Sequence, residues 1–199
     1  MSTRKSEAPK IALLALAAAS SLAVAETGNF SVRALENSTS GGVGLATFDL
    51  VAGQQFNVTA DAADLWNAGA LPRWSNADGL VGNLTYTSGT DTEVPAVAND
   101  TLIGQPFPNW SQGGLVAPYG SLVGQIGGGN FFLIGTHFSG TAGASGTLKL
   151  FYFDSNNGDN TGSILAHVTA VPEPESYAML LAGLGIMGAV ARRRKAAQA

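Results

Sequence analysis

Apolar and polar residues alternate in short runs through the middle of the chain. In the run QQFNVTAD, Phe56 and Val58 fall on the same side, and in GTLKLFYF, Leu148, Leu150 and Tyr152 do so. A period of two is typical of β-strands, because successive side chains point to opposite faces of the strand. This pattern, together with glycine-bounded apolar runs, predicts strands at residues 54–61, 83–88, 120–127, 130–138, 146–153 and 163–170.

These runs predict an all-β fold, an antiparallel β-sandwich of the jelly-roll or lectin-like kind. The chain contains 26 glycines, which suit the many turns of such a fold, and this region has no convincing amphipathic helical pattern. Residues 61–82 and 91–118 lack regular alternation and are predicted as long loops. We expect Trp66 and Trp74, which lie in the first of them, to be buried beneath it.

The N-terminal segment has the three parts of a secretory signal peptide. Arg4, Lys5 and Lys10 precede or adjoin an apolar segment at residues 11–22, and a small-x-small cleavage site, Ala-Val-Ala, occupies residues 23–25. The alternative is an uncleaved membrane anchor, for which the apolar segment is short. We therefore predict a signal helix at residues 1–25, export through the secretion translocon, and cleavage after residue 25.

The C-terminal segment also has three parts. Pro172, Glu173 and Pro174 form a stiff segment that cannot extend a helix backwards. An uncharged apolar run at residues 177–191 follows, and as a helix it would be roughly 22 Å long, against about 30 Å for the hydrocarbon core of a membrane. We predict a single transmembrane helix there. The basic tail that should remain cytoplasmic consists of Arg192, Arg193, Arg194 and Lys195.

This order of motif, apolar run and basic tail resembles the PEP-CTERM sorting signal of Gram-negative bacteria. The resemblance implies recognition by an exosortase-type membrane enzyme, removal of the tail, and release from or attachment to the outer surface. It also implies an association with exopolysaccharide or the biofilm matrix. A plain single-pass anchor would have the same topology. The predicted organisation is a signal peptide at 1–25, a β-sandwich domain at 26–170 and a sorting segment at 171–199.

Charge limits the possible partners of the predicted domain. Between residues 26 and 170 only Arg33, Arg73 and Lys149 are basic, whereas eleven residues are acidic. A surface of that sign does not neutralise phosphates, so we expect no nucleic-acid binding. The chain has no cysteine, which excludes disulfides, thiolate metal sites and thiol catalysis.

The densest group of polar residues lies in FDSNNGDNTGS, residues 153–163, between two predicted strands. Calcium is bound in proteins by about six to eight oxygen atoms, largely from carboxylates and carbonyls. Gly158 permits a sharp turn here, but the spacing does not fit an EF-hand. Ordinary turn chemistry is the alternative explanation, because Asn, Asp and Gly are common in hairpins. The oxygen-bearing residues are Asp154, Asn156, Asn157, Asp159 and Asn160.

Residues 119–163 resemble the C-terminal half of the PA-I-type galactophilic lectins, which are bacterial β-sandwiches that hold a sugar through bound calcium. The run GSLVGQIG at 120–127 matches a strand of that family. The resemblance implies Ca²⁺ as cofactor, with Asp154, Asp159 and Asn160 as metal ligands. The stretch WSQGGLV resembles the family's sugar loop, and here Gln112 matches the sugar-contacting glutamine.

The chain departs from the lectin pattern in ways that bear on its specificity. The loop at 154–160 is shorter, Asp159 replaces the first of two asparagines, and the sugar-contacting histidine is absent. Trp110 stands near that position and is predicted to lie against the C–H face of a sugar. The predicted carbohydrate-binding residues are therefore Trp110, Gln112 and Asp154. These departures leave the preferred sugar open.

Taken together, the sequence predicts an exported, surface-sorted, calcium-dependent carbohydrate-binding protein that is not an enzyme and contacts extracellular polysaccharide. His137 and His167 are isolated in their strands, and Asp61 and Asp64 fall in a predicted loop with nothing evident to position them. Neither pattern supports catalysis. Two alternatives remain: a structural matrix protein that binds no ligand, and a glycan-processing enzyme.

Overall fold

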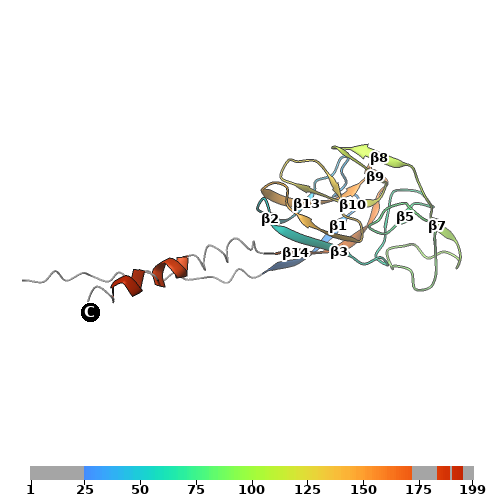
Figure 1. The fold of residues 1–199 in the computed structure, drawn as a ribbon. Helices are drawn as coiled ribbons and strands as arrows, with labels where there is room; N and C mark the ends of the chain where they lie inside the picture. Colours follow the sequence, from blue (N-terminus) through green and yellow to red (C-terminus); the bar gives the residue numbers. More distant parts are fainter. Residues whose placement is uncertain (1–24, 172–182, 189, 195–199) are drawn as a thin grey trace, which may run out of the picture.

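A computed structural model describes residues 25–171, 183–188 and 190–194 of the chain. Residues 25–171 form a body of β-strands, as predicted (Figure 1). The described strands are β1 (Glu26–Arg33), β2 (Leu45–Leu50), β3 (Gln55–Ala60), β4 (Trp66–Asn67), β5 (Trp74–Ser75), β6 (Leu84–Thr85), β7 (Leu102–Gly104), β8 (Asn109–Gln112), β9 (Leu115–Pro118), β10 (Ser121–Ile126), β11 (Phe132–Leu133), β12 (His137–Thr141), β13 (Gly146–Phe153) and β14 (Thr161–Ala170).

Two antiparallel sheets make up the body. One has the order β12-β3-β14-β4-β5, with β1 also paired to β14, and the other has the order β11-β10-β13-β2. Two small hairpins, β6–β7 and β8–β9, complete it. The long strand β14 pairs with β1 over eight residues and with β3 over five, so it lies between them. The architecture agrees with the predicted all-β sandwich.

The main hydrophobic core joins the two sheets. Phe56 and Val58 of β3 are buried, as are Leu148, Leu150 and Tyr152 of β13, so the side chains that the alternation grouped together do face the core. Burying each large apolar side chain stabilises the fold by about 1.5–3 kcal/mol. This core is therefore the principal source of stability for the body.

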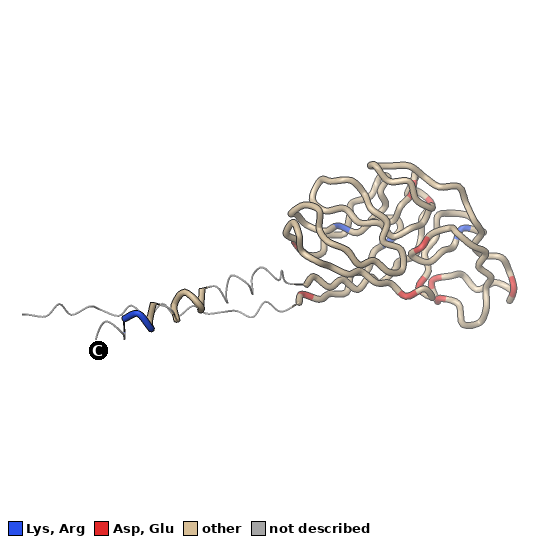
Figure 2. The backbone as a smooth tube through the Cα atoms, in the orientation of Figure 1, with Lys and Arg blue, Asp and Glu red and all other residues tan. Residues whose placement is uncertain are grey.

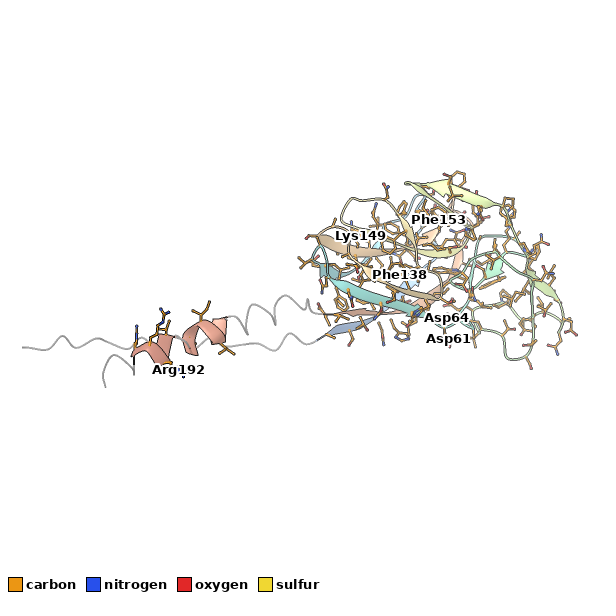
Figure 3. All side chains as sticks on the ribbon, in the orientation of Figure 1. Asp61, Asp64, Phe138, Lys149, Phe153 and Arg192 are labelled. Carbon is orange, nitrogen blue, oxygen red and sulfur yellow. The ribbon has the colours of Figure 1, made fainter. Side chains whose placement is uncertain are left out.

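The opposite side of β13 is also covered. Phe151 and Phe153 are buried in a second cluster with Ala117 of β9, and the partly buried Phe131 packs edge-on against Phe151 at a ring-centroid distance of 5.2 Å. Phe153 is labelled in Figure 3. The β8–β9 hairpin therefore forms an outer layer on this sheet, which places the predicted sugar loop over a packed aromatic base.

The predicted long loops at 61–82 and 91–118 are a partial error, because they contain β4, β5, β7, β8 and β9. These strands have two to four residues each, too few to produce a recognisable alternation. One of the pairings also joins distant parts of the chain, with Trp66 opposite Gly162. The burial of both tryptophans is confirmed, with Trp66 0% and Trp74 3% exposed.

The predicted strand at 130–138 is in fact two strands in different sheets, β11 and β12. The chain changes direction at Gly135, which has a φ of +67°. The carboxylate of Asp78 fixes this corner, since its Oδ1 accepts hydrogen bonds from Thr136 N at 2.7 Å and from Thr136 Oγ1 at 3.0 Å. The apolar run at 130–138 could not predict this break between strands, because the break depends on a carboxylate that is distant in the sequence.

Both ends of the body leave from the same end of the sandwich. Glu26 at the start of β1 lies opposite Ala170 at the end of β14, and Val171 N donates to Gln55 O at 2.8 Å. The predicted signal peptide, except residue 25, and the Pro-Glu-Pro segment lie outside the described residues. So do parts of the predicted transmembrane run at 177–191.

The described part of the C-terminal segment is helical at residues 183–188 and 190–194. It includes Arg192, which is labelled in Figure 3, and the described part of the basic tail, residues 192–194, is blue in Figure 2. Among the residues that the structure describes, no helix combines the length and apolar character needed to cross a membrane.

Candidate functional site

The predicted metal loop connects β13 to β14, and Asp154 is its first residue. Asp154 is only 5% exposed, and its Oδ1 accepts a hydrogen bond from Ser155 N at 2.6 Å. Thr39 fixes the backbone here: its Oγ1 donates to Asp154 O at 3.0 Å and accepts from Asp154 N at 3.2 Å. The carboxylate is thus held in place at the end of a long, buried strand.

Asn160 ends the loop and is buried beside it, with 3% of its surface exposed. Its Nδ2 donates to Ala34 O at 3.2 Å, whereas its Oδ1 has no hydrogen-bond partner among the residues that the structure describes. A buried amide oxygen without a partner costs about 1–3 kcal/mol. Such an atom is a natural ligand for a cation, since the cation would remove that cost.

Burial raises the pKa of Asp154 above its ordinary value. Hydrogen bonds from Ser155 N, Asn160 and Asn156 N act in the opposite direction, and the negative charge of Asp159 raises the pKa further. Among the described residues, the recorded ion pair joins Arg33 and Glu36 and does not involve this loop. The buried carboxylate therefore lies near a second negative charge with no basic side chain paired to it.

Asp159 lies at the exposed rim of the loop. Its carboxylate packs against Gly69 in the turn between β4 and β5, where a Cβ on residue 69 would collide with Oδ2 of Asp159. Gly69 also has a φ of +115°. The structure thus brings Asp154 and Asn160 together and places the charge of Asp159 near them. Within the described residues, no three His, Asp or Glu side chains could hold a metal by themselves, so amide and backbone oxygens would have to complete a ligand set.

Gln112 and Trp110, the predicted sugar contacts, lie on β8 beside this loop. Gln112 Nε2 donates to Thr39 O at 2.9 Å, and its Oε1 accepts from Trp110 Nε1 at 3.3 Å. Since Thr39 also holds Asp154, one residue links the two predicted groups. Ser40 Oγ lies 3.4 Å from Gln112 Oε1, so a sugar hydroxyl would have to compete for this amide.

Sequence reasoning missed the contribution of the turn after β1, which supplies Ala34, Thr39 and Ser40. The polar run ENSTSGG at residues 36–42 has the composition of an ordinary turn. Thr39 lies 115 positions before Asp154, and local spacing contains no information about a contact of that range. It also missed Tyr119, whose hydroxyl donates to Ser155 Oγ at 3.1 Å.

A second group of carboxylates lies near the middle of β14. Asp64 follows Asp61 in one turn (Figure 3), and its Oδ2 accepts a hydrogen bond from Leu165 N at 2.7 Å. Asp64 is therefore positioned, contrary to the expectation from sequence. Burial raises the pKa of Asp64, the bond from Leu165 lowers it, and Asp91 and Glu93 raise it. Because the carboxylates bind backbone N–H groups, their evident role is to hold the loops to β14.

The C-terminal segment matches a known protein family. Residues 170–195 match the family described as the PEP-CTERM protein-sorting motif. The chain carries a PEP-CTERM sorting signal. This confirms the prediction made from the Pro-Glu-Pro segment, the apolar run and the basic tail. The PEP-CTERM motif supports export with transient membrane anchoring before sorting, and implies processing by an exosortase.

Comparison of the whole PEP-CTERM chain with curated proteins gave no match. A comparison with solved structures found similarity to the EclA N-terminal domain, which is described as a PllA-like lectin. That similarity has a TM-score of 0.43 and 21% sequence identity, and it covers 72% of this chain and 95% of the other.

Proposed function

We propose that this PEP-CTERM protein binds carbohydrate outside the cell through a calcium ion held by Asp154, Asp159 and Asn160. The observation that carries the proposal is the unpartnered Oδ1 of the buried Asn160 beside the buried carboxylate of Asp154. A calcium ion would give the amide oxygen a partner and would offset the two negative charges at once. Backbone carbonyls of the loop and water would complete its oxygen ligands.

The surroundings of the loop suit a sugar. Bound calcium accepts hydroxyl oxygens as ligands in place of water, so two neighbouring hydroxyls of a sugar ring would complete its coordination. The half-exposed ring of Trp110 offers an apolar surface to the C–H face of that sugar. Gln112 is within reach to hydrogen-bond a further hydroxyl once its contact with Ser40 is exchanged.

The sorting signal suggests where such binding would be used. Processing by an exosortase would place the domain at the outer surface or in the extracellular matrix of a Gram-negative bacterium, where polysaccharide is abundant. A calcium-bridged contact would then attach the protein to exopolysaccharide of the biofilm matrix. A matrix protein without a ligand would have the same destination but would not need the buried polar loop.

Calorimetric titration of calcium into residues 25–171, which contain both sheets and all the described core clusters, tests the proposal. We expect binding in the wild type and its loss in Asp154→Ala. Glu26→Ala is the matched control, because it removes one negative charge at the opposite end of β14. A glycan array with and without chelator would follow. Absence of calcium heat in the wild type, or equal heat in Asp154→Ala, would contradict the calcium site and favour the ligand-free matrix protein.

A further inference from the structure

Three partly exposed aromatic rings form a continuous strip on the outer layer of the body. The ring centroids of Phe107 and Tyr119 are 5.2 Å apart with planes at 78°, and those of Tyr119 and Trp110 are 5.8 Å apart with planes at 35°. Phe107 and Tyr119 are half-buried against the main core, and Trp110 is half-buried against the cluster that contains Phe151 and Phe153. We call Phe107, Tyr119 and Trp110 the aromatic strip. Its rings are fixed in place and retain accessible surface.

The central ring of the aromatic strip, Tyr119, and its end ring Trp110 adjoin the candidate calcium loop. The hydroxyl of Tyr119 donates to Ser155 Oγ, next to Asp154, and the indole Nε1 of Trp110 donates to Gln112 Oε1. A sugar chain that begins at the loop would therefore meet these rings as its next surface.

The other end of the strip carries a positive charge. The guanidinium carbon of Arg73 lies 4.2 Å from the centroid of the Phe107 ring. Arg73 is half-buried, and among the described residues the recorded ion pair does not involve it. Its backbone is held by the hydrogen bond from Ala68 N to Arg73 O at 3.1 Å. The charge is also close enough to Tyr152, beneath the loop, to lower the pKa of its hydroxyl against the larger effect of burial.

This cation is unusual in its surroundings. Figure 2 shows a body in which acidic residues outnumber basic ones, and Arg73 is one of three basic residues between 26 and 170. Asp154 and Asp159 provide negative charge at one end of the strip, and Arg73 provides positive charge at the other. Such a gradient favours a ligand that brings hydroxyls to the loop and an anionic group to Arg73.

The chemistry of these groups selects one class of ligand. Aromatic faces stack against the C–H faces of sugars, and a guanidinium binds a carboxylate through two parallel hydrogen bonds. A neutral glycan would use the rings but would leave Arg73 without a partner. An acidic oligosaccharide would contact both the aromatic rings and the guanidinium of Arg73.

We propose that Arg73 and the aromatic strip form a second subsite, which binds a carboxylated sugar residue of an oligosaccharide whose neighbouring sugar occupies the calcium loop. This rests on the proposed carbohydrate binding and extends it by naming the ligand class as acidic glycans. Arg73 is then a specificity-determining residue, and the calcium loop is the common anchor.

The test compares a galacturonic acid trisaccharide with its methyl ester in calorimetric titrations with calcium present. The two probes share shape and hydroxyls and differ in charge. We expect residues 25–171 to bind the acid about tenfold more tightly than the ester. Arg73→Gln should abolish that difference and leave binding of the ester unchanged. Arg33→Gln, which removes an equal charge from the pair with Glu36, should preserve the preference.

Arg73→Gln also removes the contact with Phe107, so Arg73→Lys serves as a second variant that keeps a cation over the ring. It should retain a reduced preference for the acid, because the planar fork is lost. An equal loss of acid and ester in Arg73→Gln would show a structural role and overturn the proposal. The proposal would also be overturned if the wild type bound the acid and the ester equally. It would be overturned as well if the wild type bound calcium but neither trisaccharide. Binding of neither calcium nor trisaccharide would overturn the proposed function as well.

Discussion

Single residues without side chains decide the geometry of the candidate calcium loop. Gly69 lets the turn between β4 and β5 approach the carboxylate of Asp159, and Gly120 lies where a Cβ would meet Ser75 Oγ at 2.7 Å and Tyr152 Oη at 3.2 Å. Both glycines have positive φ angles, +115° and +75°. The loop therefore depends on glycines that have no side chain to offer as a ligand.

We expect Gly69→Ala to weaken calcium binding about tenfold, because the new methyl group displaces the carboxylate of Asp159. The strained backbone should also lower the free energy of unfolding by about 1–3 kcal/mol. Calorimetry and denaturant unfolding measure the two effects. Gly89→Ala is the matched control, since a Cβ there meets no atom within 4 Å. Calcium affinity that is equal in both variants would contradict the placement of Asp159.

At the scale of elements, the β8–β9 hairpin connects the sheet that holds the core to the predicted sugar contacts. The hairpin lies over Phe151 and Phe153 of β13, and Phe131 N donates to Gly113 O in its turn at 3.0 Å. Trp110 itself packs against this cluster, so the packing on this face of β13 also determines where Trp110 and Gln112 lie.

Phe131→Ala should loosen this hairpin more than the rest of the body. We expect faster amide hydrogen exchange in residues 109–118 and weaker sugar binding, with a loss of about 2 kcal/mol in the free energy of unfolding. Phe30→Ala is the control, because Phe30 makes a similar edge-on contact with Phe48 at 5.3 Å on another part of the body. If both variants exchange equally fast in the hairpin, the role assigned to Phe131 is wrong.

The residue pattern predicted several of the long strands and few of the short ones. β3 and β13 came from alternating runs, because successive side chains of a strand point to opposite faces, and β10 came from an apolar run bounded by glycines. Sequence reasoning did not find β1 or β2, and it could not find β4 and β5, which have two residues each. In the same way, Asp154 was predicted from its loop, whereas Thr39 was not, because tertiary pairing alone brings it to the candidate site.

At the scale of the whole molecule, buried carboxylates link stability to pH. The pKa of Asp154 is raised in the fold, so the folded state binds that proton more tightly than the unfolded state. Without calcium, protonation of Asp154 therefore stabilises the fold as pH falls through the raised pKa, and this stabilisation is lost as pH rises through the same range.

In calcium-free buffer, Asp154→Asn should therefore be more stable than the wild type at neutral pH, by about 1 kcal/mol. The difference should disappear below the pKa of an unfolded aspartate, where both side chains are neutral. With calcium the order should reverse, because the asparagine lacks the charge that holds the ion. Denaturant unfolding from pH 3 to 8 measures this. A wild type that is more stable than Asp154→Asn in chelator at neutral pH would contradict the prediction.

Strand β14 starts beside the candidate calcium loop at Thr161 and ends at Ala170, next to the sorting segment. Its ten residues span roughly 33 Å, so a polysaccharide held at the loop and a membrane holding the tail would pull on opposite ends of one strand. The hydrogen bonds to β1 and β3 run across that direction and would be loaded in shear, all at once rather than one after another. A domain built this way would resist mechanical force for as long as its tail stays anchored in the membrane.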